Sequence, residues 1–229
     1  MKSKRYKKLL EKTNELPSAK IDSVLNLIKS NCTTKFDESV DLSFRINNKQ
    51  KKNEVNLRTV VNLPGGTGKS IKVAVVCEES KIDEAKNANA DVVGGDDLVE
   101  KIKNGDLNFE KLICTPSMMI KLSKLGKVLG PKGLMPNPKL GTVTNDISKA
   151  VKEAKAGQVE IRNDKDGNIG LSIGKKSFED DKIIKNYLAV IDALEKEKSN
   201  LTIKGDLVKH VFITSSMGVS YKLKLDKSF

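Results

Sequence analysis

The 229-residue sequence contains no tryptophan, and aromatic residues make up only 4% of it, so aliphatic side chains must fill any hydrophobic core. It has a single histidine, His210, which excludes every metal site that needs two imidazoles. His210 falls within an alternating pattern at residues 208–213, which predicts an exposed strand position rather than a member of a catalytic triad. We therefore expect no catalytic residue, no metal and no cofactor.

Cysteine and long apolar runs are also scarce. Cys32, Cys77 and Cys114 are odd in number and contain no CxxC pair, which favours reduced thiols in a reducing compartment over a disulfide framework. No apolar run approaches the ~18 residues of a membrane span. The basic N-terminus lacks the apolar segment of a secretory signal. These features predict a cytoplasmic protein with no membrane partner.

Basic side chains, in contrast, are abundant. The 42 lysines and arginines exceed the 30 acidic residues and give a net charge of +12, although only four of the 42 are arginine. Such an excess predicts a polyanionic partner, most often a nucleic acid, while a lysine-rich proteome would produce the same composition. Hydrophobic residues make up 38% of the chain, enough for a folded core.

The two ends of the chain have similar patterns. Alternating apolar residues predict strands at residues 40–46, 58–63, 208–214 and 221–225, and a hairpin over residues 159–173. Helical spacing predicts one helix after Ser18 and another over residues 178–198, with Ser18 and Ser177 as the expected N-caps. The second helix opens with three acidic residues, which argues against a double-stranded DNA regulator that reads DNA with this helix.

The middle of the chain differs from both ends. Residues 71–77 form a nearly continuous apolar run, as in a strand buried on both faces, and strand and helix patterns alternate up to residue 128. The expected fold is therefore two-domain α/β: a split α+β domain from residues 1–69 and 158–229, with an inserted Rossmann-like α/β domain at 70–157. Two consecutive domains would give the same periodicity. The split domain carries a net charge of +10.

The stretch GGTGKS at residues 65–70 resembles the end of a phosphate-binding loop. The full motif needs glycine at position 63, where this chain has Leu63, and a helix directly after the loop. Residues 71–76 instead predict a strand, so a flexible crossing between domains is the preferred interpretation. Its hinge residues would be Gly65, Gly66 and Gly68, with Gly157 at the second crossing. A small nucleotide-binding protein using this loop remains the alternative.

Two further loops have the residues of an RNA contact. Residues 126–143 contain four glycines and three prolines, and residues 111–145 contain six lysines and no acid. Such a loop can meet phosphates through backbone amides and ammonium groups, although an elaborate surface turn would look similar. The stretch TSSMG at residues 214–218 places hydroxyls and a glycine between two strands, which suits either RNA recognition or a simple hairpin turn.

The order of the motifs resembles the ribosomal protein L-one family, the stalk proteins of the large ribosomal subunit. The specific match is GPKGLMPNPK at residues 130–139 followed by GTV, and it is supported by KFDESV at 35–40, KAG at 155–157 and SMG at 216–218. Gly65 and Gly66 stand where the family often has histidine after the proline, and Val219 stands where proline is common. The resemblance covers essentially the whole chain.

This resemblance implies a non-enzymatic, ribosome-associated protein that binds the stalk of large-subunit ribosomal RNA. It also implies contact with the departing E-site tRNA, repression of the protein's own mRNA, and a monomer when free. The residues carried over as RNA contacts are Lys35, Phe36, Ser39, Lys165, Lys175, Thr214, Ser216, Met217 and Gly218. Secondary RNA contacts are expected from Lys127, Lys132 and Lys139.

Overall fold

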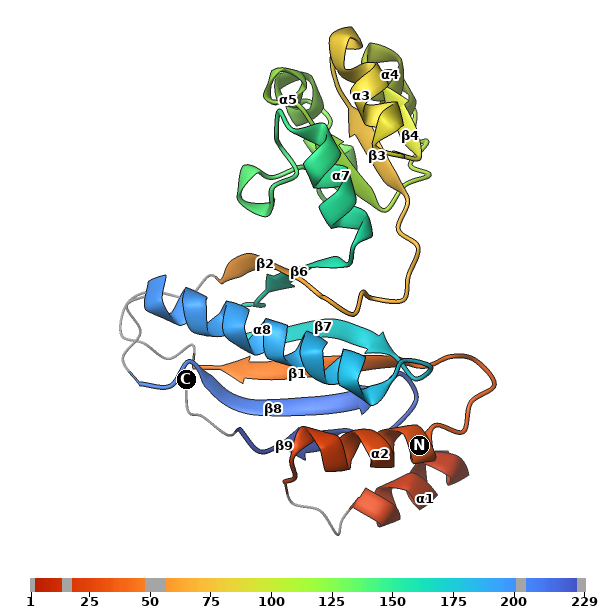
Figure 1. The fold of residues 1–229 in the computed structure, drawn as a ribbon, viewed down its shortest axis with the longest axis vertical. Coiled ribbons are helices and arrows are strands. Elements are labelled where there is room, and N and C mark those ends of the chain that lie inside the picture. The colour runs from red at the N-terminus through yellow and green to blue at the C-terminus, as the bar shows by residue number, and fades with distance from the viewer. Residues whose placement is uncertain (1–2, 14–17, 48–56, 201–204, 226–229) are drawn as a thin grey trace. The chain divides into compact units, whose positions relative to one another are not determined.

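A computed structural model of the chain describes residues 3–13, 18–47, 57–200 and 205–225. The chain divides into two compact units, unit 1 from residues 1–68 and 159–229 and unit 2 from residues 69–158. Both units combine sheets with helices, so the fold is mixed α/β (Figure 1).

Unit 1 contains a four-stranded antiparallel sheet with the strand order β7-β1-β8-β9 and a two-stranded sheet formed by β2 and β6. Three helices complete the described part of this unit. Its elements are α1 (Lys4–Thr13), α2 (Ile21–Asn31), β1 (Ser39–Ile46), β2 (Arg58–Asn62), β6 (Gln158–Arg162), β7 (Asn168–Lys175), α8 (Asp180–Asn200), β8 (Val208–Ser215) and β9 (Tyr221–Leu223).

The core of unit 1 lies on one face of the four-stranded sheet. Strand β1 alternates as the sequence predicts: Val40, Leu42, Phe44 and Ile46 are all at most 2% exposed. Apolar residues of α2 and α8 belong to the same buried cluster, so both helices cover this face. His210, on β8, is exposed, as predicted. The fold therefore takes its stability mainly from aliphatic packing.

The register of the sheet determines which chain ends meet. Because β1 runs antiparallel to both neighbours, β7 and β8 end where β1 begins, as the arrows in Figure 1 show. Ser39 at the start of β1 pairs with Lys175 at the end of β7, and Val40 pairs with Ser215 at the end of β8. Residues more than 130 positions apart in the sequence are thereby neighbours at one edge.

The two predicted N-caps are wrong. Helix α2 starts after Lys20, and Ser18 makes no cap there, because the next residue, Ala19, bridges to β9. Helix α8 starts at Asp180, since the amides of Lys182 and Ile183 donate to the carbonyl of Glu179. Ser177 instead donates its hydroxyl and its amide to Asp37. A tertiary partner replaces the local cap in this case.

The hairpin predicted over residues 159–173 is also wrong, because its two arms do not pair with each other as neighbouring strands of one sheet. Strand β6 pairs with β2 and β7 pairs with β1. The two arms meet next to the turn, through the bridge between Asn163 and Ile169 and the bond from the amide of Asp164 to the carbonyl of Asn168. The Asn163 side chain accepts a hydrogen bond from the amide of Leu57 at 2.6 Å, while the amide of Ile46 donates to Gly167 at 2.8 Å. These contacts pull the two arms into different sheets.

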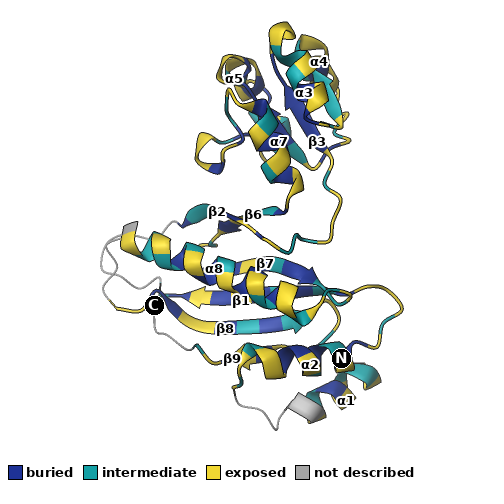
Figure 2. Cartoon of the chain, viewed as in Figure 1, coloured by how far each residue is buried: buried dark blue, intermediate teal, exposed yellow. Residues whose placement is uncertain are grey.

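Unit 2 is built on a parallel three-stranded sheet with the order β4-β3-β5. Strand β3 is buried along its whole length, as predicted, and Figure 2 draws it dark blue, but it is shorter than the predicted residues 71–77 because Ile71 is half-buried and Lys72 is exposed. Helices α4 and α5 cover one face and α3 and α7 the other. The elements are β3 (Val73–Val76), η1 (Glu79–Lys81), α3 (Ile82–Asn87), β4 (Val92–Gly94), α4 (Asp96–Lys103), β5 (Lys111–Cys114), α5 (Pro116–Ser123), α6 (Gly126–Leu129), η2 (Pro138–Leu140) and α7 (Ile147–Lys155).

Several elements differ from the sequence-based expectation. The helical pattern that ends at residue 128 is interrupted, because the amides of Lys124 and Leu125 bond three residues back and tighten the turn between α5 and α6. Helices α1 and α7 are not among the elements predicted from the sequence. For α7 a signal exists: apolar residues recur at helical spacing, and Asp146 caps the helix by accepting from the amide of Lys149.

The cysteines behave as predicted, since Cys32, Cys77 and Cys114 are all buried and none forms a disulfide. Burial raises the pKa of the Cys114 thiol to about 11. Among the helices that the structure describes, none has the length and apolar character to cross a membrane.

The chain leaves unit 1 through a segment held by a buried asparagine. Asn186 on α8 is completely buried, and its Oδ1 accepts a hydrogen bond from the amide of Gly65 at 2.7 Å. Its Nδ2 donates to the carbonyls of Gly66 at 3.0 Å and Ile173 at 2.7 Å. Of the proposed hinge residues, Gly65 and Gly66 are therefore tied to the core of unit 1. Gly68, with φ +73°, follows this anchor, whereas Gly157, with φ +102°, lies on the second crossing.

Replacing Asn186 with alanine should destabilise unit 1 by about 2–3 kcal/mol, because it leaves shielded backbone groups of the crossing and of β7 without partners. Urea unfolding followed by tyrosine fluorescence measures this unit alone, since Tyr6, Tyr187 and Tyr221 all belong to it and the chain has no tryptophan. The control is Asn26→Ala on α2, whose amide makes only an exposed contact one turn away. Equal midpoints for the two variants would contradict the proposed anchoring.

Candidate nucleic-acid interface

The main predicted contact residues, except Lys165, gather at the edge of unit 1 where β1 begins. We call this set the recognition surface, and it comes from three segments: the loop between α2 and β1, the end of β7, and the end of β8 with the turn that follows. It consists of Lys35, Phe36, Ser39, Lys175, Thr214, Ser216, Met217 and Gly218. The antiparallel register, described above, is what brings the three segments together.

Hydrogen bonds of backbone amides close the turn after β8 against the start of β1. The amide of Ser39 donates to the hydroxyl of Ser216 at 3.0 Å, and the amide of Ser216 donates to the carbonyl of Ser39 at 3.1 Å. The amide of Gly218 donates to the carbonyl of Ser215 at 3.0 Å. A Cβ at Gly218 would lie 2.3 Å from the Ser215 hydroxyl, so a side chain at this position would displace that hydroxyl.

The surface exposes two large apolar side chains. Phe36 is 55% exposed and Met217 is 51% exposed. Aromatic residues make up only 4% of the chain, and Phe36 is not used in the core. The lysine next to Phe36 in the sequence, Lys35, is exposed, and Lys175 is half-buried. An exposed aromatic ring beside ammonium groups suits a base that stacks and a phosphate that is neutralised.

A buried carboxylate lies beneath this surface. Glu38 is completely buried; its Oε1 accepts from the hydroxyl of Thr34 at 2.7 Å, and its Oε2 accepts from the amide of Met217 at 3.1 Å. The backbone carbonyl of Glu38 accepts from the amide of Lys176 at 2.7 Å. One residue thus joins all three segments of the recognition surface.

Two effects act on the pKa of Glu38. Burial is the larger single effect and would raise the pKa, but the hydrogen bonds from Thr34, Ser215 and the amide of Met217 together outweigh it. The pKa therefore lies below its ordinary value, and the side chain is ionised at neutral pH. The carboxylate is stabilised by donors rather than by a buried cation.

The loop after β7 is held in the same way. Asp37 accepts the hydroxyl of Ser177 at 2.7 Å and its amide at 3.0 Å, and this hydroxyl bond is the main cause of the lowered pKa of Asp37. The ammonium group of Lys176 donates to the carbonyl of Cys32 at 3.0 Å. Lys175, the last residue of β7, therefore has a defined position at the edge of the sheet.

Lys165 does not join the recognition surface. It lies in the turn between β6 and β7, and β7 then runs its full length before it reaches Lys175. At ~3.3 Å per residue this corresponds to about 23 Å along the strand. Asp164 organises the turn by accepting the amide of Asn168 at 2.7 Å. Any RNA contact of Lys165 would be a separate one.

The predicted secondary contacts lie on unit 2. Lys127, Lys132 and Lys139 are all exposed in the segment that follows α5, with Lys127 on α6, Lys139 on η2 and Lys132 in the loop between them. The end of this loop is fixed by Asn137 and Thr142: the amide of Asn137 donates to the Thr142 hydroxyl at 2.7 Å, and that hydroxyl donates back to the Asn137 carbonyl at 3.1 Å. These bonds hold the end of the loop in a defined conformation.

Some residues that build the site were not singled out by the sequence. Glu38 and Asp37 belong to the quoted motif at residues 35–40, but nothing in the sequence shows that one is buried and the other bonded to Ser177. Arg5 donates to the hydroxyl of Thr33 at 2.9 Å and to the carbonyl of Met217. Arginine is scarce in this chain, with only four among the 42 basic residues, and this scarcity is a sequence feature that could have drawn attention to Arg5.

The nucleotide-binding alternative lacks its structural requirement. The chain after Ser70 continues into β3, so no helix begins directly after the loop at residues 65–70 as a phosphate-binding loop requires. Within the described residues, no group of His, Cys, Asp or Glu is arranged to hold a metal ion.

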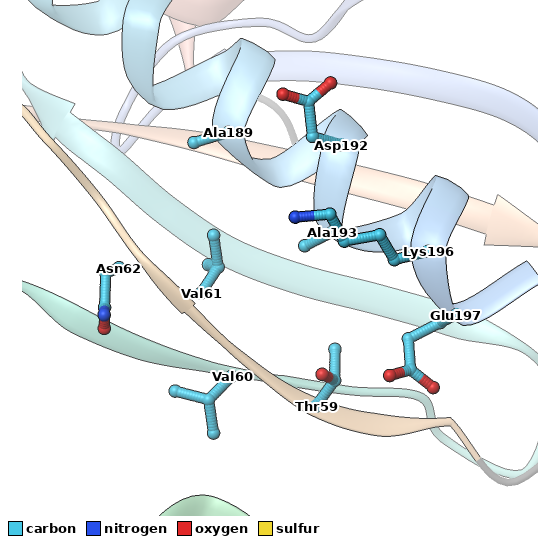
Figure 3. Close-up of a pocket in the computed structure, with 9 residues that line it drawn as sticks. All are labelled: Thr59, Val60, Val61, Asn62, Ala189, Asp192, Ala193, Lys196 and Glu197. Atoms are coloured by element: carbon cyan, nitrogen blue, oxygen red, sulfur yellow. The ribbon is translucent and has the colours of Figure 1, made fainter. Parts of the chain in front are cut away.

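A groove of about 340 Å³ lies between β2 and the second half of α8 in unit 1 (Figure 3). It is lined by a mixture of apolar and charged side chains and is separate from the recognition surface, which adjoins the start of α8. The lining residues are Thr59, Val60, Val61, Asn62, Ala189, Asp192, Ala193, Lys196 and Glu197.

Comparison with known proteins identifies relatives along the whole chain. The model of the ribosomal protein L1p/L10e family matches residues 28–219. A large ribosomal subunit protein uL1 from Pelagibacter ubique is 71% identical over 228 residues, which span all of both chains. The uL1 protein of Mycoplasma capricolum is 45% identical over 223 residues, covering 97% of this chain and 98% of its own. The protein uL1c of Arabidopsis thaliana is 44% identical over 224 residues, which cover 98% of this chain and 64% of its own.

Replacing Glu38 with glutamine should make the stability of unit 1 less dependent on acid. In the wild type the folded-state pKa lies below the ordinary value of 4.5, so the stabilisation is complete above that value and is lost as the pH falls below it. Glutamine has one acceptor oxygen in place of two and should lower stability by about 1–3 kcal/mol near pH 7. The difference between the two proteins should then shrink toward about pH 3.

The measurement is the urea midpoint of tyrosine fluorescence across this pH range. Asp22→Gln on α2, at an acidic position outside the recognition surface, controls for the loss of one carboxylate. Parallel pH curves for the wild type and Glu38→Gln would contradict the assigned role of Glu38.

Proposed function

The chain belongs to the ribosomal protein L1p/L10e family, and from this premise we propose that its recognition surface binds ribosomal RNA in the large subunit. The chain is a structural, non-enzymatic ribosomal protein, located with the ribosome in the cytoplasm. The proposed RNA is the stalk of the large-subunit ribosomal RNA, which follows from the resemblance of the motifs at residues 35–40, 130–139 and 216–218.

One observation carries this proposal: two large apolar side chains, Phe36 and Met217, stand exposed on a surface whose backbone is held by hydrogen bonds to Glu38 and Ser216. A surface of this kind excludes water at its centre and can pack against unstacked bases and riboses. Lys35 and Lys175 lie on the same surface and can approach phosphates. Hydrogen bonds of Glu38, Ser39 and Ser216 hold the backbone of this surface in one conformation. A surface with a fixed shape selects RNA by its shape, so shape is the feature that we propose is recognised.

We assign different roles to the two units. Unit 1 is the split α+β domain that provides specific RNA binding, and unit 2 is the inserted Rossmann-like α/β domain that adds electrostatic contacts through Lys127, Lys132 and Lys139. The anchoring of Gly65 and Gly66 by Asn186 supports a hinge that begins after residue 66 and not at Gly65.

The same surface supports two further roles. An mRNA segment that presents the same shape as the ribosomal site would compete for the recognition surface, which is the physical basis of repression of the protein's own mRNA. Departing E-site tRNA would be contacted mainly through phosphates, for which exposed lysines are suited. The protein is proposed to be a monomer when free.

Replacing Met217 with aspartate should weaken binding to the stalk RNA by roughly a hundredfold, because a carboxylate would face phosphates at the centre of the surface. The matched control is Leu188→Asp on α8, because Leu188 is also 51% exposed and lies outside the recognition surface. Both variants should keep the wild-type circular dichroism spectrum. The proposal fails if the two variants bind the RNA equally well in a filter-binding titration.

Replacing Lys127, Lys132 and Lys139 together with glutamine should flatten the salt dependence of RNA binding and slow association. Exposed charges act over a Debye length of ~10 Å at ~0.1 M salt, so these lysines matter mainly at low salt. Discrimination between stalk RNA and a scrambled RNA at high salt should remain, since it depends on unit 1. A loss of discrimination in stopped-flow and equilibrium measurements would show that the loop of unit 2 reads the RNA.

A further inference from the structure

The N-terminal helix α1 lies against the recognition surface through its only arginine. Among the described residues, Arg5 donates from Nη1 to the hydroxyl of Thr33 at 2.9 Å and from Nη2 to the backbone carbonyl of Met217. Thr33 belongs to the loop that carries Lys35 and Phe36, and Met217 belongs to the turn after β8. One guanidinium therefore bridges two of the three segments that form the recognition surface.

The helix is held in place by its apolar side. Leu9 is 5% exposed and belongs to the core cluster of unit 1, and Tyr6 and Leu10 pack against the same cluster. These residues recur at helical spacing, so the opposite side of the helix faces solvent. A helix anchored in this way keeps its charged residues at fixed positions relative to the recognition surface.

The solvent-facing side of α1 is strongly basic. The helix contains five basic residues and one acidic residue, and Lys4, Lys7 and Lys8 are exposed. Residues three or four positions apart lie on the same side of a helix, so Lys4 and Lys8 neighbour each other and Lys8 also neighbours Arg5. No acidic residue occurs in the first turn of the helix to neutralise them.

We infer that α1 is part of the RNA interface: Arg5 positions the Met217 turn, and Lys4 and Lys8 contact the phosphates that flank the RNA bound by the recognition surface. This inference depends on the proposed function. Arginine suits the positioning role because its planar fork can donate to a hydroxyl and a carbonyl at once, whereas lysine is a single point of charge. The family match begins at residue 28, so α1 extends the interface beyond the segment that the match covers.

The two parts of the inference predict different salt behaviour. Lys4→Gln/Lys8→Gln removes phosphate contacts, so the slope of log affinity against log salt should fall by about one to two, with high-salt affinity little changed. Arg5→Ala also releases the Met217 turn and should lose roughly tenfold in affinity at both low and high salt. Arg5→Lys restores the charge but not the bridge, so it should recover affinity at low salt only.

The experiment measures binding of the full-length protein to stalk RNA and to a scrambled RNA over a range of salt concentrations. Lys209→Gln is the matched control, because Lys209 is exposed on β8 at the end of the sheet opposite the recognition surface, and it should leave the slope unchanged. Urea midpoints of tyrosine fluorescence identify a variant whose unit 1 has lost stability. If Arg5→Ala lowers the urea midpoint, the positioning role of Arg5 is tested with Arg5→Lys instead, provided that Arg5→Lys keeps the wild-type midpoint.

The outcomes separate this inference from the proposed function. Wild-type binding with no preference for stalk RNA overturns the function itself. Preference for stalk RNA in the wild type, with unchanged affinity and slope in the Arg5→Ala and Lys4→Gln/Lys8→Gln variants, overturns only the role of α1. Full high-salt affinity in Arg5→Lys overturns the positioning role and leaves Arg5 as one more phosphate contact.

Discussion

The recognition surface depends on the buried carboxylate of Glu38. Its two oxygens accept hydrogen bonds from Thr34 and from the amide of Met217, and its backbone carbonyl accepts from Lys176. A buried carboxylate without donors would be strongly destabilising, so the loop before β1 and the turn after β8 must keep their donors in position. Because the polar groups beneath are satisfied, Phe36 and Met217 can remain exposed on a rigid support.

The second condition is the antiparallel register of the four-stranded sheet. It places the start of β1 beside the ends of β7 and β8, so that Ser39, Lys175 and Ser215 lie at one edge despite their separation in sequence. Arg5 adds the N-terminal helix to the same edge through Thr33 and Met217. This edge of unit 1 is therefore assembled from both ends of the chain, as the division into units requires.

Asn186 connects this edge with the crossing to unit 2. Its amide group holds Gly65 and Gly66 and also bonds the carbonyl of Ile173, two residues before Lys175 on β7. The first crossing is thus part of the hydrogen-bond network of unit 1 up to Gly66. Gly68 lies just beyond this point and adopts a φ of +73° that other residues rarely take.

The sequence by itself determined the α/β class, the fully buried strand β3, the inward alternation of β1 and the family, because these depend on local periodicity and on specific motifs. It could not determine that β6 and β7 separate into different sheets, or that Ser177 bonds Asp37 instead of capping α8. The burial of Glu38, the clamp of Asn186 and the bridge of Arg5 were likewise decided only by the tertiary structure. In each case a polar side chain has several local options of similar free energy, and partners that are distant in the sequence select one.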